Sequence, residues 1–307
     1  MANPIRGQVH IVGSGAIGSL IAAGAQRNQI SYSLTPRRPE QLTQRLTSYS
    51  GQSRWLSGNL TSKQKLGPDD LLIFPLKAYQ LEEAVKQWME RLDESTPILL
   101  LQNGMGGLET IRKLLPEHAV YIATTSHGVL KTQPHEVKHT GFGRTIFGEA
   151  PDNSAVDDEQ LERVFETVSR CLQPVTWHKN IIEALWLKLA VNAVINPLTA
   201  LHDIQNGGLK DERFAGHIDD ISQEMVAVMQ SEGYRYSVQD LVGQVRQVIN
   251  ATSQNYSSMH QDVKHKRPTE IDAINGYIVQ TAQKKGIDVP INAFLYKKIK
   301  SLEAAYS

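Results

Sequence analysis

The sequence predicts an α/β domain with a parallel sheet, followed by an all-α domain. In the first half, short apolar runs such as residues 9–12 and 97–101 alternate with helical patterns, which is typical of βαβ units. After Lys179 the strand patterns stop and helical periodicity continues to the end of the chain. We therefore expect a boundary near Lys179, with residues 1–179 in the first domain and residues 180–307 in the second.

Composition restricts the class of protein. The 307 residues are 40% hydrophobic and 21% charged, which is typical of a soluble globular protein with a sizeable core in each domain. The 32 basic and 32 acidic residues balance, so nothing indicates a nucleic-acid partner. We see no apolar run approaching the roughly 18 residues of a membrane span and no signal peptide. The single cysteine, Cys171, excludes an intrachain disulfide, and we expect a cytoplasmic protein in which Cys171 is buried.

A glycine motif opens the first domain. Gly13-Ser14-Gly15-Ala16-Ile17-Gly18 follows a predicted strand at residues 9–12 and precedes a helical pattern at residues 19–26. In this context Gly13 permits a tight turn, Gly15 lets backbone approach a pyrophosphate, and Gly18 lets helix and strand pack closely. The helix N-terminus then offers N–H groups to phosphates. We predict a Rossmann-type dinucleotide domain; the alternative is a glycine-rich turn without a ligand.

The residues after the second strand indicate which dinucleotide binds. That strand is expected at residues 30–34, and Thr35-Pro36-Arg37-Arg38 follows it. An acidic residue at this point would bind the ribose 2′-hydroxyl of NAD, whereas a guanidinium suits the 2′-phosphate of NADP. We predict NADP, with Arg37 the first candidate and Arg38 the second. The alternative is that both arginines are exposed loop charges.

Later strand ends supply further candidates, because ligands of such sheets lie outside the carboxyl ends of the strands. Lys77, Asn103 and the turn at residues 126–128 follow three predicted strands. His127 in that turn could equally be a satisfied loop histidine. Residues 136–148 are expected to form a β-hairpin appended to the sheet.

An apolar stretch at residues 183–201 dominates the second domain. Lys188, Asn192 and Asn196 interrupt it at steps of four, so the three line one stripe of a mostly buried helix. The stripe is either a satisfied polar network or an active-site wall, in which a desolvated lysine with a lowered pKa moves a proton. Pro197 removes a backbone donor, so we expect the helix to kink or end there.

Other parts of the second domain show weaker signals. Helices are predicted at residues 182–201, 215–231, 237–251, 271–284 and 293–305. A polar cluster precedes Pro268; its Ser257 and Ser258 could cap a helix, and Glu270 could favour a helix dipole. His260 and His265 lack partners at metal-ligand spacing, so we predict no metal. A cleft between the two domains is the expected small-molecule site.

The chain resembles the ketopantoate reductase (2-dehydropantoate 2-reductase) family over essentially its full length. The resemblance rests on G-S-G-A-I-G at residues 13–18, L-K-A at 76–78, N-G-M-G at 103–106, L-W-x-K-L-A-V-N-x-V-I-N-P-L-T-A at 185–200, S-S-M-x-Q-D at 257–262 and T-E-I-D-x-I-N-G at 269–276. The long lysine-helix motif is highly specific, whereas the glycine motif alone is not.

The resemblance implies a role for each matching position. Lys188 matches the general acid that protonates the ketone oxygen, and Glu270 matches the acid that orients substrate and lysine near the nicotinamide ribose. The positions implied on the substrate side are Asn192, Asn196, Ser258, Asn206, Asn255 and Asn103. The positions implied on the cofactor side are Gly13, Ser14, Gly15, Ala16, Ile17, Gly18, Arg37, Lys77, Asn103, Glu270 and Val129, the last through its backbone.

The resemblance also implies the reaction, which is NADPH-dependent reduction of 2-dehydropantoate to (R)-pantoate in pantothenate and coenzyme A synthesis. The implied partner is this small substrate, on a monomer or homodimer, with neither nucleic acid nor membrane. Two alternatives stay open: a related NADP-dependent 2-oxo acid reductase, and a non-catalytic NADPH sensor. A sensor has no need of the lysine stripe and would bind the cofactor without turnover, whereas a related reductase would keep the lysine and alter the asparagines and the serine.

Overall fold

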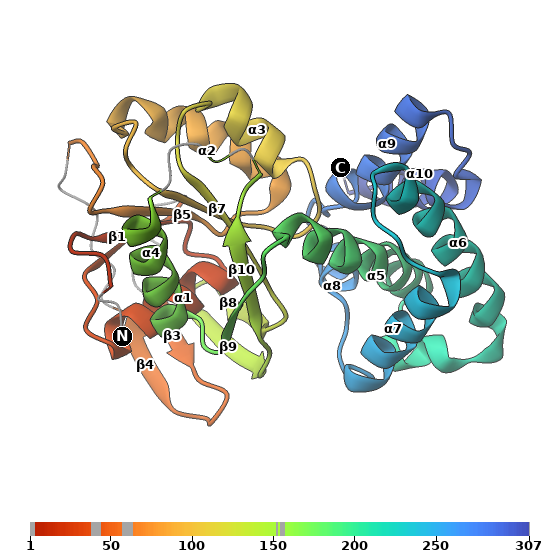
Figure 1. Cartoon of the computed structure of the whole chain (residues 1–307). Helices are drawn as coiled ribbons and strands as arrows, with labels where there is room; N and C mark the ends of the chain where they lie inside the picture. The colour runs from red at the N-terminus through yellow and green to blue at the C-terminus, as the bar shows by residue number, and fades with distance from the viewer. Residues whose placement is uncertain (1–3, 38–43, 57–63, 152, 154–156, 307) are drawn as a thin grey trace. The chain divides into compact units, whose positions relative to one another are not determined.

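The computed structural model describes residues 4–37, 44–56, 64–151, 153 and 157–306. The chain divides into two compact units. The α/β unit comprises Met1–Gln102 and Gly107–Ile182, and the helical unit comprises Asn103–Gly106 and Glu183–Ser307. These are the two fold classes that the sequence predicts, in the predicted order (Figure 1). The short segment Asn103–Gly106 groups with the helical unit although it follows a strand of the sheet.

A seven-stranded sheet forms the centre of the α/β unit, in the order β11-β10-β7-β6-β5-β1-β2. Its strands are β1 Val9–Val12, β2 Tyr32–Thr35, β5 Leu71–Phe74, β6 Ile98–Leu101, β7 Val120–Thr125, β10 Thr145–Glu149 and β11 Val175–Trp177. Neighbouring strands are parallel except for β7 and β10, which are antiparallel. The four-residue strands β1, β5 and β6 are buried along their whole length, as expected of parallel strands covered on both faces.

A second sheet of four strands corrects the predicted hairpin. The hairpin is formed by β8 (Gly128–Gln133) and β9 (Glu136–Gly141). Its β9 pairs with β3 (Gln44–Thr47), which in turn pairs with β4 (Ser53–Leu56), in the order β4-β3-β9-β8. β10, which was expected within the hairpin, joins the large sheet instead. β3 and β4 were not predicted, because three of the four β4 residues are exposed and give no apolar pattern.

Helices α1 (Ala16–Arg27) and α4 (Asp158–Cys171) lie side by side against the sheet (Figure 1). A Cβ at Gly24 of α1 would collide with the carbonyl of Cys171, so the two helices approach closely. Cys171 is buried, as expected, and burial raises the pKa of its thiol to about 12. The remaining helices of this unit are α2 (Leu81–Trp88) and α3 (Gly107–Leu114), with single 3₁₀ turns η2 (Ala78–Gln80) and η3 (Met89–Arg91).

The helical unit contains no strand among its described residues. Its helices are α5 Ile181–His202, α6 Ala215–Ser231, α7 Val238–Ala251, α8 Ser258–Lys264, α9 Tyr277–Lys285 and α10 Pro290–Ala304, with 3₁₀ turns η4 Asn206–Lys210 and η5 Glu212–Phe214 and one π-turn, η6 Asp272–Gly276. The seven-residue α8 is not among the predicted helices, although Ser257 and Ser258 were considered as a helix cap. Ser257 caps it by accepting a hydrogen bond from the His260 N–H at 3.1 Å.

The central helix, α5, bears on two expectations, the kink or end at Pro197 and the lack of a run long enough for a membrane span. It does not end at Pro197 but continues to His202. Over the described part of the chain it is also the one helix whose length and composition would allow it to cross a membrane. However, 67% of its most apolar window is buried inside the protein, which is the environment of a core helix.

Candidate active site

The glycine loop between β1 and α1 has a constrained geometry. Gly13 has a φ of +111°, a conformation that side chains rarely adopt. Its N–H donates to the carbonyl of Thr35 at the end of β2, with an N–O distance of 2.7 Å. A Cβ at Gly18 would collide with the carbonyl oxygen of Gly13. Glycine is therefore required at Gly13 by conformation and at Gly18 by the close approach of α1 to the loop.

The N-terminus of α1 fits an anionic group. Gly15 is its N-cap residue, no side chain in the described structure caps it, and its first turn holds no acidic residue. A Cβ built at Gly15 meets no described atom within 4 Å, so the backbone there faces open space. N–H groups of a first helical turn have no partner within the helix. The loop and α1 therefore fit the phosphates of a dinucleotide.

Two predicted cofactor contacts follow neighbouring strands. β1 lies between β2 and β5, and all three are parallel, so their carboxyl ends share one edge of the sheet. The exposed Arg37 follows β2, and the partly exposed Lys77 follows β5 as the N-cap residue of η2. Arg38 lies outside the described residues. The sheet thus brings Arg37, Lys77 and the glycine loop to the same edge.

The predicted nicotinamide contact, Val129, lies on β8 in the second sheet and pairs with His139. His127, just before β8, is buried, and its Nδ1 lies 3.1 Å from Nε2 of His139. His127 Nδ1 accepts the Gly143 N–H, and His139 Nε2 lies 2.9 Å from the carbonyl of Gly141. Burial lowers the pKa of both histidines. These contacts hold Nδ1 of His127 within its loop, whereas its buried Nε2 has no hydrogen-bond partner among the described atoms.

Lys188 and Glu270 are the predicted catalytic residues of the helical unit. Lys188 lies on α5, and burial of its ammonium group lowers its pKa from 10.5 to about 8. The carboxylate of Glu270 acts in the opposite direction and raises the pKa of Lys188. Glu270 is only 4% exposed, so it is not the solvated helix-end acid of the plainer interpretation. The pair gives a lysine that is protonated at neutral pH and able to release that proton.

The two asparagines of the stripe lie further along α5. Asn192 is partly exposed and Asn196 is buried. One turn past them, Thr199 Oγ1 lies 2.8 Å from Oγ of Ser257, the residue that caps α8. This contact joins the end of α5 to the start of α8. It therefore brings the exposed Ser258 to the end of α5 that carries Asn196.

Asn206 and Asn255 meet through their backbones. The Asn206 N–H donates to the carbonyl of Asn255 at 2.9 Å, and Asn206 Nδ2 donates to Thr252 Oγ1 at 2.9 Å. Asn206 is buried and Asn255 is exposed. The structure thus brings the two together, and it uses the Asn206 amide to join η4 to the loop after α7.

Asn103 is held close to η6. In the segment Asn103–Gly106, the Met105 N–H donates to the carbonyl of Ala273 at 2.9 Å. Gly104 has a φ of +83°, and a Cβ there would collide with the same carbonyl. Ala273 is three residues after Glu270, so Asn103 belongs to the same part of the helical unit as Glu270.

Sequence reasoning missed a set of buried polar side chains in this unit. Glu224, Asn275 and Asn292 form one hydrogen-bonded chain. His260 lies 2.6 Å from Asp203 and stacks on Tyr256 with ring centroids 4.4 Å apart. Asn275 lies within a motif that carries the family resemblance, but no spacing in the sequence indicates its partners.

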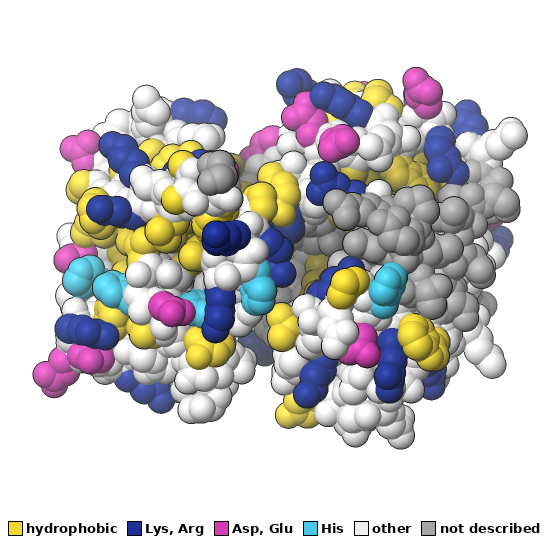
Figure 2. Space-filling view, turned by 180° about the vertical axis from the view of Figure 1, so that it is seen from behind, with side chains coloured by type: hydrophobic (Ala, Val, Ile, Leu, Met, Phe, Trp, Pro, Cys, Tyr) yellow, Lys and Arg dark blue, Asp and Glu magenta, His cyan; other side chains and the backbone are white. Residues whose placement is uncertain are grey.

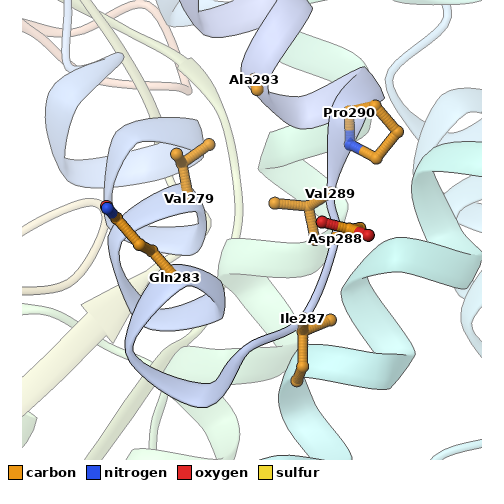
Figure 3. Close-up of a pocket in the computed structure, with 7 residues that line it drawn as sticks. All are labelled: Val279, Gln283, Ile287, Asp288, Val289, Pro290 and Ala293. Carbon is orange, nitrogen blue, oxygen red and sulfur yellow. The ribbon is translucent and has the colours of Figure 1, made fainter.

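A surface pocket of about 500 Å³ lies between α9 and the start of α10 (Figure 3). Its lining is mainly apolar, and it comprises Val279, Gln283, Ile287, Asp288, Val289, Pro290 and Ala293. It contains no residue predicted for the substrate or the cofactor.

On the face in Figure 2, Lys and Arg side chains are spread over the surface with acidic side chains between them.

Comparison with known proteins decides the family. The family model described as "Ketopantoate reductase PanE/ApbA" matches residues 9–152, and "Ketopantoate reductase PanE/ApbA C terminal" matches residues 180–303. This chain belongs to the ketopantoate reductase family. The 2-dehydropantoate 2-reductase of Vibrio cholerae is 40% identical over 297 residues, which cover 97% of this chain and 98% of that protein. The corresponding protein of Yersinia pestis is 34% identical over 302 residues, covering 97% and 96%.

Solved structures agree with this ketopantoate reductase assignment. The PanE/ApbA family ketopantoate reductase of Ralstonia eutropha superposes with a TM-score of 0.85 at 25% identity, covering 98% of this chain and 99% of that one. D-mandelate dehydrogenase, solved with NADH and anilino(oxo)acetate, superposes with a TM-score of 0.87 at 23% identity and the same coverage. The second likeness concerns the fold alone.

Proposed function

We propose that this chain catalyses the NADPH-dependent reduction of 2-dehydropantoate to (R)-pantoate, a step of pantothenate and coenzyme A synthesis. The observation that carries the proposal is Lys188, whose pKa is lowered to about 8 by burial beside Glu270. Full-length similarity to 2-dehydropantoate 2-reductases supports the same substrate. When bound, NADPH supplies the hydride that reduces the ketone carbon.

Lys188 is the general acid of the proposed mechanism. As negative charge develops on the ketone oxygen, the Lys188 ammonium donates a proton from Nζ to that oxygen. A pKa near 8 suits this task, because the lysine is protonated at pH 7 and its proton is held less tightly than that of a solvated lysine. Glu270 keeps Lys188 charged by offsetting part of the desolvation.

The polar residues near Lys188 orient the substrate. We assign Asn192, Asn196 and Ser258 to the hydroxyl and carboxylate of 2-dehydropantoate, since amide and hydroxyl groups can donate to both. Asn103 is assigned to substrate and cofactor, and Asn206 and Asn255 complete the substrate side through their joined loops. Residues 180–307 are then the catalytic domain.

Residues 1–179 are the cofactor domain in this proposal. The loop from Gly13 to Gly18 binds the pyrophosphate, and Arg37 binds the 2′-phosphate of NADPH. Lys77 lies at the same sheet edge as both. The backbone at Val129 contacts the nicotinamide, and Glu270 lies near its ribose. We further propose a cytoplasmic location and a monomer or homodimer, which light scattering distinguishes.

The direct test follows loss of NADPH absorbance with purified protein. Ketopantoate, pyruvate, 2-oxoisovalerate and benzoylformate are compared as substrates, with NADPH and NADH as cofactors. We expect rapid turnover with NADPH and ketopantoate and much slower turnover in every other combination. Preference for another 2-oxo acid would replace the substrate assignment. NADPH binding without turnover of any substrate would make the chain a sensor and contradict the proposal.

A further inference from the structure

Pro197 leaves one backbone carbonyl of α5 without its helical donor. In an α-helix the N–H of each residue donates to the carbonyl four residues earlier, so the missing N–H of Pro197 is the one that would serve Ala193. A proline ring also pushes that carbonyl aside. α5 nevertheless continues through Pro197 to His202. A buried carbonyl without a donor is costly, and Ala193 is fully buried.

Asn275 supplies the donor. Its Nδ2 donates to the Ala193 carbonyl at 3.2 Å and also to Oδ1 of Asn292 at 2.9 Å. Both asparagines have no exposed surface. A side-chain amide nitrogen has two hydrogens, so this group satisfies both acceptors at once.

Glu224 fixes the direction of this chain of hydrogen bonds. Its Oε2 accepts from Nδ2 of Asn292 at 2.7 Å and from the Asn292 backbone N–H at 2.9 Å, and its Oε1 accepts from the Ile291 N–H at 2.8 Å. A carboxylate accepts and never donates, so the Asn292 amide must turn its nitrogen toward Glu224 and its oxygen toward Asn275. Asn275 therefore presents its nitrogen to α5.

The last hydrogen bond of the chain, from Asn275 to Ala193, joins η6, which follows Glu270, to α5, which carries Lys188. Asn275 is part of η6, the π-turn that begins two residues after Glu270 and is closed by a 2.9 Å hydrogen bond from the Gly276 N–H to the Ile271 carbonyl. Ala193 lies on α5 between Asn192 and Asn196, five residues after Lys188. Single π-turns are frequent at functional sites.

We propose that Asn275 is a positioning residue that supplies the hydrogen-bond donor Pro197 lacks and thereby joins the π-turn after Glu270 to the part of α5 that carries Lys188. This inference rests on the proposed function for its catalytic consequence. The structural part of the inference is that a side-chain donor replaces the missing N–H of a proline. This part depends only on the hydrogen bonds and not on the proposed function.

A double-mutant cycle separates the donor role of Asn275 from its positioning role in catalysis. The four proteins are wild type, Asn275→Leu, Pro197→Ala, and the double variant. Leucine keeps the branched outline of Asn275 and its number of heavy atoms but removes both amide hydrogens, while alanine in place of Pro197 restores a backbone N–H to the Ala193 carbonyl. We expect Asn275→Leu to lower the thermal midpoint by about 4 °C or more in wild type. In the Pro197→Ala background we expect roughly half that loss, because one of the two acceptors is satisfied again.

Turnover should respond differently from stability. Leucine in place of Asn275 removes the connection between η6 and α5 in both backgrounds, so we expect kcat for ketopantoate to fall about tenfold in both. The Kd for NADPH should change much less than kcat, because the remaining cofactor-side residues do not depend on Asn275. Asp272→Asn is the matched control, because Asp272 lies in the same π-turn but contacts Tyr296 and Lys300 on the exposed side. It should leave kcat and the Lys188 pKa at their wild-type values.

The outcomes are decisive. An equal loss of thermal midpoint in both backgrounds would overturn the donor role, and an unchanged kcat in Asn275→Leu would overturn the positioning role. If Asn275→Leu alone does not fold, recovery of folding in the double variant supports the inference and its absence overturns it. If wild type does not reduce ketopantoate, the proposed function fails. The positioning role is then tested by measuring the pKa of Lys188 by NMR, and Asn275→Leu must shift this pKa from its wild-type value.

Discussion

The proposed cofactor loop and the proposed catalytic pair are built in opposite ways. The loop is one run of six residues, and its shape is set by glycine conformation and by contact between Gly18 and Gly13. The catalytic pair brings together Lys188 and Glu270 from segments far apart in sequence. The α5 end of this arrangement is held by polar side chains from α6, η6 and α10. A local site tolerates changes elsewhere, whereas an assembled site depends on every buried partner.

The largest expected effect concerns the assembled site. Lys188→Ala should lower kcat about 10²-fold or more, because the general acid is lost. Lys188→Met keeps most of the apolar stem and should lose as much, which attributes the effect to the ammonium group. Lys298→Ala, at an exposed position on α10, is the control and should keep wild-type kcat. Turnover within a few-fold of wild type in folded Lys188→Ala would remove Lys188 from the mechanism.

The glycine loop offers a matched pair of equal substitutions. Gly15→Ala should weaken NADPH binding about tenfold or more while leaving the cofactor-free thermal midpoint unchanged, since a Cβ at Gly15 meets no described atom of the chain. Gly18→Ala should weaken binding and also lower that midpoint, because its Cβ collides with Gly13. Calorimetry with and without NADPH measures both. Equal midpoints for the two variants would contradict the local account of the loop.

The arginine after β2 should have a smaller, more selective effect. Arg37→Ala should raise the KM for NADPH about tenfold and leave the KM for NADH unchanged, since only NADPH carries the 2′-phosphate. Arg38→Ala is the parallel variant, and the larger change identifies the residue that binds the phosphate. If neither variant changes the preference between the cofactors, the phosphate is bound elsewhere.

The smallest expected effect is a shift in a pH profile. Glu270 raises the pKa of Lys188, so Glu270→Gln should lower that pKa. The loss of reductase activity at alkaline pH should then begin at a lower pH than in wild type. Glu303→Gln, which changes an acid that bonds the Thr269 N–H, is the comparison. An unmoved or higher midpoint in Glu270→Gln would separate Glu270 from the charge state of Lys188.

The contrast between the units also explains what the sequence could predict. β1, β11 and α6 begin and end where their patterns indicate, because apolar period and turn residues are local signals. β3 and β4 were missed because β4 is largely exposed. Of the two outcomes expected at Pro197, a kink or an end, the end does not occur. The Ala193 carbonyl, which loses the proline's N–H, accepts instead from Asn275, almost eighty residues after Pro197. Such a contact depends on tertiary structure, so the residues around Pro197 give no signal of it.

The same reasoning applies to the candidate site. The stripe of Lys188, Asn192 and Asn196 could be identified from a spacing of four on one helix. Burial lowers the pKa of Lys188 to about 8, as the active-site alternative for the stripe expects, while the roles of Lys188 and the surrounding residues stay predictions. Glu224 and Asn292 could not be found, because a buried polar residue gives no signal until its partners are known.

The most direct measurement is the pH dependence of kcat/KM in both directions. Lys188 has a pKa lowered to about 8, so its acid form disappears as the pH rises through that value. Reduction of ketopantoate, which needs the acid, should fall above pH about 8, and oxidation of pantoate, which needs the base, should rise over the same range. In Lys188→Ala, neither the fall of the reduction rate nor the rise of the oxidation rate near pH 8 should remain. Profiles that change in the same direction, or that persist without Lys188, would contradict the account.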